Sequence, residues 1–400
     1  FMRSADWIDN LAVRASYGIQ GNIDKNTSPY VMGTYKVEQI LPGNSENTIR
    51  VDSPPNDKLR WEKTQSVNAG LDFSVLDQAI SLGIDYYYRY SSDLIGTKMT
   101  PLETGFSSTT VNWATLRNQG IELSLTTRNI HTKNFTWYTN FNIGYNNNKI
   151  LKMSVPANQT TPSLVGYPIG AIFAYPSAGL DSEGYPLFLN SAGEKVTAEQ
   201  YFNMKNDGPD LTAEEHRALF KYIGTTEPLY SGGFTNTFTI KRFEIAVNCI
   251  FNLGQYVQTQ PSYSITSYDR GMNTNRDILD RWTPSNPNGR FPALISDTKN
   301  GQSYRHNEYT AFNDLNYYNS MDTWVKKGNY MRIQSIRVGY KLPENWLKLF
   351  HMSSGSISLE GRNLFVVGSD YTNYLDPETM GNVYAQPIPK SVTFSLNLNF

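Results

Sequence analysis

The chain has 400 residues, and 35 basic against 36 acidic side chains give a formal net charge of −1, which excludes a generally basic nucleic-acid-binding protein. Charged residues make up 18% of the sequence and aromatic residues 13%, a composition that favours a wall between lipid and water over a cytosolic enzyme. The single cysteine, Cys249, excludes a disulfide framework within the chain, and no run of about 18 apolar residues offers a transmembrane helix.

The start of the chain, residues 1–6, has neither the basic region nor the apolar stretch of a signal peptide. A protein that crosses a bilayer without helices must do so as a closed β-barrel, because every backbone polar group has to be paired internally. Such a protein has to be exported. The sequence therefore predicts a chain that begins inside a longer protein, with the mature N-terminus of a complete small barrel as the alternative.

Apolar and polar residues alternate over stretches of about ten residues, which is the pattern of membrane-spanning strands. In 243–253 the odd-numbered residues are apolar, and in 392–400 the even-numbered residues are apolar up to Phe400. Ten strands are predicted in all, at residues 9–20, 66–75, 80–90, 118–127, 135–145, 231–240, 243–253, 330–342, 355–365 and 392–400. The fold class that follows is all-β, a transmembrane antiparallel β-barrel.

Charged residues within these stretches fall on the polar phase, as a lipid-facing apolar phase requires. They are Arg14, Asp72, Asp85, Glu122, Glu244 and Arg362. The stretch 330–342 departs from this rule, because Arg332 and Gln334 share the phase of the apolar residues that follow them. We expect a β-bulge or an interfacial start there.

The connections between the predicted strands alternate between short and long, as do the periplasmic turns and extracellular loops of outer-membrane barrels. The short ones are 76–78, 129–133, 241–242 and 343–354; the long ones are 21–64, 95–115, 149–229, 255–328 and 366–389. Pro343 indicates a short helix in 343–354, and Thr212 with Glu215 indicates a capped helical excursion over 197–222. Extracellular loops as long as 149–229 and 255–328 should be folded and functional.

Motifs of catalysis and metal binding are absent from the sequence. The four histidines are scattered, and HExxH, Gly-x-Ser-x-Gly and phosphate-binding glycine loops are missing. Asp181 and Glu183 lack the ligand spacing of a calcium loop. We therefore predict no enzyme, no catalytic residue, no metal site and no cofactor.

Aromatic residues are dense in the long connections, where flat rings beside polar side chains suit sugars or peptides. As first choices for substrate contact we select Trp282, Tyr175 and Tyr268, with Asp269 and Arg270 beside Tyr268 as hydrogen-bonding partners. The alternative is that these rings pack the loops together or form an aromatic girdle at the membrane interface.

Several segments resemble, in order along nearly the whole chain, the C-terminal barrel of SusC/RagA-type TonB-dependent outer-membrane transporters. They are LAVRASYG at 11–18, LRWEKT at 59–64, GLDF at 70–73, NQGIE at 118–122, SGGFTN at 231–236, NYMRI at 329–333, GYKLP at 339–343, GRNL at 361–364 and LDPE at 375–378. The resemblance implies a barrel of about 22 strands, of which residues 1–400 would be the C-terminal part, without the plug and the N-terminal strands.

The same resemblance implies TonB-dependent active import of a glycan or oligopeptide across the outer membrane of a Gram-negative, Bacteroidetes-like bacterium. The implied partners are a SusD-like surface lipoprotein, outer-membrane lipid, and TonB acting through the missing N-terminal region. Two other classes stay open. A passive porin-type channel would share the strands but lack plug and lid. A surface glycan-binding β-protein would share the aromatic loops but needs a polar outer face.

Overall fold

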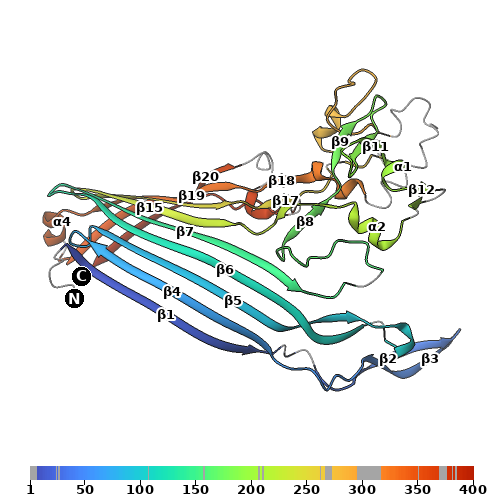
Figure 1. Cartoon of the computed structure of the whole chain (residues 1–400). Helices are drawn as coiled ribbons and strands as arrows, with labels where there is room; N and C mark the ends of the chain where they lie inside the picture. The colour runs from blue at the N-terminus through green and yellow to red at the C-terminus, as the bar shows by residue number, and fades with distance from the viewer. Residues whose placement is uncertain are drawn as a thin grey trace. The chain divides into compact units, whose positions relative to one another are not determined.

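The computed structural model describes residues 7–23, 25, 28–106, 108–155, 158–205, 208, 209, 211–261, 263–265, 273–294, 317–349, 351–368, 376–380, 382 and 385–400. Its main element is a 10-stranded sheet in which strands that follow one another along the chain are hydrogen-bonded neighbours (Figure 1). In order these are β1 (Ile8–Asn22), β4 (Glu62–Val75), β5 (Ile80–Met99), β6 (Ser108–His131), β7 (Phe135–Lys152), β15 (Tyr230–Ile240), β16 (Phe243–Leu253), β19 (Tyr330–Lys341), β20 (Ser354–Gly368) and β21 (Ser391–Asn399). The ten predicted strands and the all-β fold class are confirmed.

Several strands are longer than the alternation indicated. β5 has 20 residues and β6 has 24, so the predicted connection 95–115 is wrong and shrinks to 100–107, around the short 3-10 helix η1 (Leu102–Thr104). Alternation is required only where one face of a strand meets an apolar medium. Where a strand extends beyond the apolar medium, both of its faces can be polar. The alternation of apolar and polar residues that predicts the strand then disappears.

The chain divides into two compact units, which we describe separately. The first comprises residues 1–125, 144–156 and 164–169, and the second comprises 126–143, 157–163 and 170–400. In the first unit, antiparallel pairing of β1, β4 and β5 places apolar residues in rows across the strands, among them Leu11–Phe73–Leu82 and Val13–Leu71–Ile84. The opposite face carries an ion-pair cluster, in which Arg14 lies 3.0 Å from a carboxylate oxygen of Asp72 and 3.0 Å from one of Asp85.

A separate hairpin, β2 (Met32–Leu41) with β3 (Asn44–Ser53), occupies much of the predicted connection 21–64. The sequence analysis did not predict it.

In the second unit, the register of five neighbouring strands places most apolar residues in rows on one face and most polar residues in rows on the other, with Asn236 opposite Val247 and Ile250 opposite Arg332 as exceptions. One row is Phe238–Ile245–Val338–Leu359–Phe394, and the row beside it, on the other face, is Thr239–Glu244–Gly339–Ser358–Ser395. A shift of one residue in any strand would reverse its faces, so the register itself maintains the separation.

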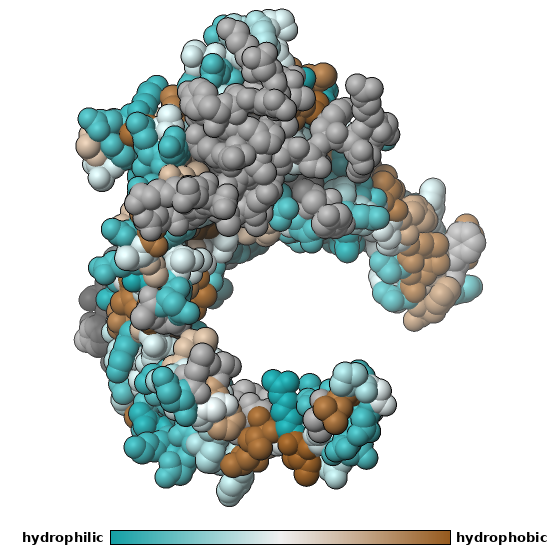
Figure 2. All heavy atoms as spheres, turned by 90° about the vertical axis from the view of Figure 1, so that its right-hand side faces the viewer, coloured by the Kyte–Doolittle hydropathy of each residue, from teal (hydrophilic) through white to brown (hydrophobic). Residues whose placement is uncertain are grey.

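The apolar rows of this unit are exposed at the surface of the molecule. Val338, Leu359 and Phe394 are 42%, 52% and 65% exposed. Figure 2 shows hydrophobic residues, in brown, lying at the surface among hydrophilic ones. A contiguous apolar surface of this kind marks a face that contacts an apolar partner or medium.

Of the two expectations for residues 330–342, a bulge or an interfacial start, β19 contains the bulge. Ile333 pairs with Cys249 of β16, but the next pair is Ser335 with Asn248, so Gln334 is the extra residue. The register shifts at the same place against β20. Before Gln334 the odd-numbered residues of β19 lie on the apolar face, and after it the even-numbered ones do. Arg332, although even-numbered, therefore lies on the face of the polar rows.

The short connections are close to those predicted. β15 and β16 meet at a two-residue turn in which Lys241 has a φ of 53°. The helix α4 (Glu344–Leu349) directly follows Pro343. The predicted excursion over 197–222 is instead two short helices, α1 (Ala198–Tyr201) and α2 (Ala213–Ala218), and strand β14 (Lys221–Thr225) begins before the predicted end. The Thr212–Glu215 capping box is present.

The long connections contain further small elements. Connection 149–229 contains β8 (Ala171–Ala174), β9 (Ser177–Leu180), β10 (Pro186–Leu189), β11 (Lys195–Thr197), α1, β12 (Met204–Lys205), β13 (Gly208–Pro209), α2 and β14. Connection 255–328 contains β17 (Tyr256–Gln258), η2 (Arg276–Asp280), η4 (Tyr318–Ser320), η5 (Asp322–Trp324) and β18 (Val325–Lys327). The 3-10 helix η7 (Pro377–Thr379) lies between β20 and β21. No helix in the described residues combines the length and hydropathy needed to cross a membrane.

Candidate functional site

The two long connections of the second unit fold around one shared core. Tyr175 stacks on Phe220, with ring centroids 4.2 Å apart, and meets Phe202 edge-on at 5.0 Å. Phe202 in turn stacks on Tyr317 of the other connection at 4.2 Å. The buried members of this loop core are Tyr175, Tyr185, Phe188, Ala198, Tyr201, Phe202, Tyr263, Ile265, Ile278, Leu294, Tyr317, Tyr318, Met321 and Trp324. Side chains that are far apart in the sequence thus hold both segments in one folded body.

Two of the residues selected for substrate contact lie inside these loops. Tyr175 is 1% exposed and Trp282 is 8% exposed. Trp282 packs over Gly184, where an added Cβ would lie 2.6 Å from the indole ring. Such burial supports the alternative that these rings hold the loops together, and their contact with substrate stays a prediction. Tyr268, Asp269 and Arg270 lie outside the described residues, and their contact with substrate also stays a prediction.

The polar groups of the loop core are held in their neutral forms. Burial raises the pKa of the Tyr175 and Tyr201 hydroxyls, and the Tyr201 hydroxyl donates to the Leu219 carbonyl at 2.6 Å. His216 Nε2 lies 3.2 Å from the Tyr317 hydroxyl, and burial lowers the pKa of His216. Across the described residues, His, Cys, Asp and Glu side chains form no group of three that could hold a metal ion. The core is built for packing and hydrogen bonding.

The lowered pKa of His216 makes the loop core sensitive to acid. In the unfolded chain His216 takes up a proton near its ordinary pKa of 6.5, while the folded core resists protonation. The unfolded state therefore binds more protons as pH falls below about 6.5, and the loops lose stability there. We expect limited proteolysis of the loops to speed up between pH 7.5 and pH 5, and less so in His216→Gln. Equal acceleration in both proteins would contradict this role of His216.

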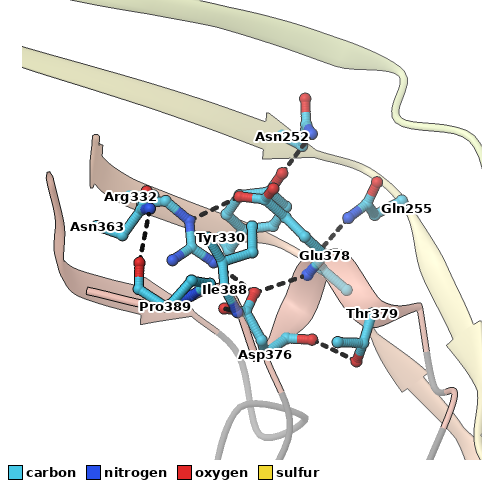
Figure 3. A network of polar contacts seen from close by, with 11 residues as sticks. Asn252, Gln255, Tyr330, Arg332, Asn363, Asp376, Glu378, Thr379, Ile388 and Pro389 are labelled. Carbon is cyan, nitrogen blue, oxygen red and sulfur yellow. Dashed lines mark hydrogen bonds and ion pairs between the residues drawn. The ribbon is translucent and has the colours of Figure 1, made fainter. Parts of the chain in front are cut away.

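A second cluster surrounds Arg332 and joins three segments of the chain (Figure 3). The Arg332 guanidinium donates to Glu378 Oε1 through Nε at 2.6 Å and to the Asp376 carboxylate through Nη2. The Arg332 side chain is 3% exposed, that of Asp376 is 6% and that of Glu378 is 29%. This Arg332 network ties η7, which lies between β20 and β21, to the start of β19.

Backbone groups complete the Arg332 network. Asp376 accepts hydrogen bonds from the amides of Glu378 at 3.1 Å and Ile388 at 3.3 Å. Burial alone would raise the pKa of Asp376, but the hydrogen bonds from Arg332 and these amides hold the pKa below its ordinary value. Asp376 therefore stays ionised at neutral pH, and the buried Arg332 charge keeps its partner.

Neighbouring bonds fix the strand from which Arg332 projects. Asn252 of β16 donates to the Tyr330 hydroxyl at 2.8 Å, and the Gly254 amide donates to Asn329 Oδ1 at 2.7 Å. Residues 329–333 and 376–378, which belong to two of the segments that carry the family resemblance, therefore meet in space. This network was not predicted from the sequence. The one indication of it was the charged Arg332 at a position that shares the phase of apolar residues, because such a side chain needs a polar partner.

The comparisons with known proteins agree with this architecture. A sequence model of the family described as "TonB dependent receptor-like, beta-barrel" matches residues 4–364. The chain is 27% identical over 397 residues to "TonB-dependent receptor P3" of Formosa agariphila, covering 94% of this chain and 37% of that protein. It is 26% identical over 422 residues to "TonB-dependent receptor SusC" of Bacteroides thetaiotaomicron, covering 100% of this chain and 38% of that protein.

Among solved structures, the chain resembles one titled "Structure of the RagAB peptide transporter", with a TM-score of 0.76, 22% identity, and coverage of 100% of this chain and 42% of that one. The same assembly in its "open-open" state gives a TM-score of 0.75 at 22% identity, covering 100% of this chain and 41% of that one. At this identity the likeness shows the fold alone. The chain spans about two fifths of the length of the proteins it matches. Because the family match covers most of its residues, the chain belongs to the TonB-dependent receptor β-barrel family.

Proposed function

We propose that this chain is the wall and loop portion of an importer that carries a glycan or oligopeptide across the outer membrane together with a SusD-like surface lipoprotein. The apolar rows of the sheet contact the lipid, and the polar rows face the interior of the transporter. TonB acts on the importer through a region outside these residues. The observation that carries the proposal is the row-by-row separation of exposed apolar residues from polar ones, in a chain that belongs to a family of TonB-dependent receptors.

The long loops supply the extracellular part of the proposed importer. Segments 149–229 and 255–328 share a core, so each helps to shape the other. We propose that this folded body faces the lipoprotein and closes over the substrate with it. The relatives named SusC and RagAB support such a partnership, and the RagAB titles name peptide as its cargo. For this chain both a glycan and an oligopeptide remain candidate substrates.

The loops can be excised at points where their ends already meet. The Thr226 amide donates to the Gly170 carbonyl at 2.8 Å, and the Gly328 amide donates to the Gln255 carbonyl at 2.8 Å. Residues 171–225 or 256–327 can therefore be replaced in the full-length protein by a short glycine linker. We expect either deletion to abolish uptake while the protein still inserts, measured by growth on single glycan or peptide sources and by surface protease protection.

Two controls separate the alternative functions. A protonophore should stop uptake through a TonB-dependent importer, whereas a passive channel would continue to admit small solutes. A surface glycan-binding protein would retain cells on glycan without any uptake. Unchanged growth on every tested source after both deletions would contradict the proposal.

A further inference from the structure

A pocket of about 450 Å³ opens at the edge of the loop core. It lies between the end of β10, the helix α1 and the residues that join α2 to β14, in the region labelled α1 and α2 in Figure 1. Its volume falls within the roughly 300–1,000 Å³ of small-molecule sites. Among the described residues, neither the Arg332 network nor Tyr175 and Trp282 line it.

Two aromatic rings line this loop pocket and are supported from behind. Phe220 stacks on Tyr175 at 4.2 Å with an angle of 28° between the rings, so the part that lines the pocket is the surface that Tyr175 leaves uncovered. Tyr201 stacks on Phe188 at 4.8 Å, and its hydroxyl is fixed on the Leu219 carbonyl. The two rings are not coplanar, since Phe220 stacks on Tyr175 whereas Tyr201 meets Tyr175 edge-on at 85°. Phe220 therefore offers the face on which a ligand can stack, Tyr201 forms a side wall, and neither ring needs to rearrange before a ligand binds.

Polar side chains at the edge of the loop pocket are also oriented in advance. Gln200 accepts a hydrogen bond from the Thr197 amide at 3.1 Å through Oε1, which leaves its Nε2 able to donate to a ligand. Asn190 Oδ1 accepts from the amides of Ala192 and Glu194 at 3.0 and 2.8 Å, and its Nδ2 donates to Glu194 Oε2 at 3.0 Å. The second N–H of Asn190 Nδ2 and the Gln200 Nε2 can donate to hydroxyl groups of a ligand.

Lys221 supplies the charge at the loop pocket, since it is the charged residue among the described residues that line it. The positive charge of Lys221 acts on the nearby Asp322 carboxylate and favours its ionised form. That carboxylate also accepts a hydrogen bond from the Ser177 amide at 3.0 Å. Asp322 is not among the described residues that line the loop pocket, so Lys221 is the charged group that a ligand contacts there. A ligand with a carboxylate is favoured over its neutral counterpart by a modest factor.

We infer that the loop pocket binds one pyranose unit of a glycan, stacked on Phe220, and that Lys221 favours a unit that carries a carboxylate. A peptide with a free amino group would require an acidic side chain, and the described lining residues include none. The inference deepens the proposed function and rests on it in one respect: the loops have to face the medium that contains the glycan.

The test uses the full-length protein in detergent, with methyl β-glucuronide and methyl β-glucoside as probes and ligand-observed NMR as the readout. We expect both to bind, the glucuronide a few-fold more tightly. Phe220→Leu keeps an apolar side chain against Tyr175 but removes the ring, so it should weaken both by up to about tenfold. Lys221→Gln should weaken glucuronide binding more than glucoside binding, and so remove the preference for the glucuronide.

The matched control is Lys195→Gln. Lys195 precedes Val196, which lines the loop pocket, and successive residues of a strand point to opposite sides. This variant should keep the preference. Binding of neither probe, unchanged binding in Phe220→Leu, or equal effects of Lys221→Gln and Lys195→Gln would overturn the inference.

Uptake in cells separates this inference from the proposed function. Probe binding without any glycan or peptide uptake would leave the pocket assignment in place and refute the importer. Uptake that persists when neither probe binds would refute the pocket assignment and leave the importer in place.

Discussion

Replacing Arg332 with alanine is expected to lower the free energy of unfolding by about 3–5 kcal/mol, because it leaves Asp376 as a buried carboxylate without its charged partner. Arg332 is 3% exposed and contacts both Asp376 and Glu378. The loss should also release η7 from β19, since no other side chain in the described Arg332 network joins those two elements through an ion pair. Urea unfolding in lipid vesicles measures the first effect, and protease cleavage between β20 and β21 measures the second.

The matched control is Arg337→Ala on the same strand. Arg337 is exposed on the polar face, in the row with Glu360 and Thr393, so its loss should change stability by less than about 1 kcal/mol. Combining Arg332→Met with Asp376→Asn and Glu378→Gln removes all three charges and should recover much of the lost stability. An Arg332→Ala protein as stable as Arg337→Ala would contradict the account of the buried ion pair.

The second large effect is expected on the apolar face of the sheet. Val247 lies in the row Asn236–Val247–Ile336–Gly361–Val392, on the face that carries the exposed apolar residues. In the proposed importer an arginine there would face the hydrocarbon of the membrane. Val247→Arg should therefore cost about 2–4 kcal/mol, the range for a cationic residue near the bilayer midplane. The measurement is the urea midpoint of folding into vesicles, together with the folded fraction in the outer membrane.

The next residue along the strand provides the control. Asn248 lies on the opposite face, beside Thr235 and Ser335. Asn248→Arg introduces the same charge into a polar, hydrated row and should cost less than about 1 kcal/mol. Similar losses in the two variants would show that the two faces meet the same medium, and the membrane assignment would fail.

The strands could be predicted because their alternation is imposed locally by the two media on either side of the sheet. The apolar phase of 243–253 was enough to place β16, and the conflicting parity of Arg332 and Gln334 was enough to expect a bulge or an interfacial start in 330–342, which the structure shows as a bulge at Gln334. The ends of β5 and β6 could not be predicted, since the strands continue where that constraint ceases.

The loop core and the Arg332 network depend on contacts between residues far apart in the chain. Nothing near Tyr175 indicates that Tyr317 will approach its ring, at 5.8 Å between centroids. The aromatic density of the loops was a correct signal of a folded body, but it does not distinguish a ring that binds a ligand from one that packs. Arg332 and Asp376 are 44 residues apart, so their pairing follows from the register of β19 and β20 and from the path of the chain after β20.

The most direct test of the account is a nitroxide scan of residues 243–253 in the full-length protein, inserted in lipid vesicles, on a Cys249→Ala background. Collisions with oxygen report contact with lipid, and collisions with a water-soluble nickel complex report contact with water. We expect nitroxides at the odd-numbered positions 243, 245, 247 and 251 to collide mainly with oxygen. Nitroxides at the even-numbered positions 244, 246, 248 and 252 should collide mainly with the nickel complex. Nickel access at the odd-numbered positions equal to that at the even-numbered ones would contradict the account.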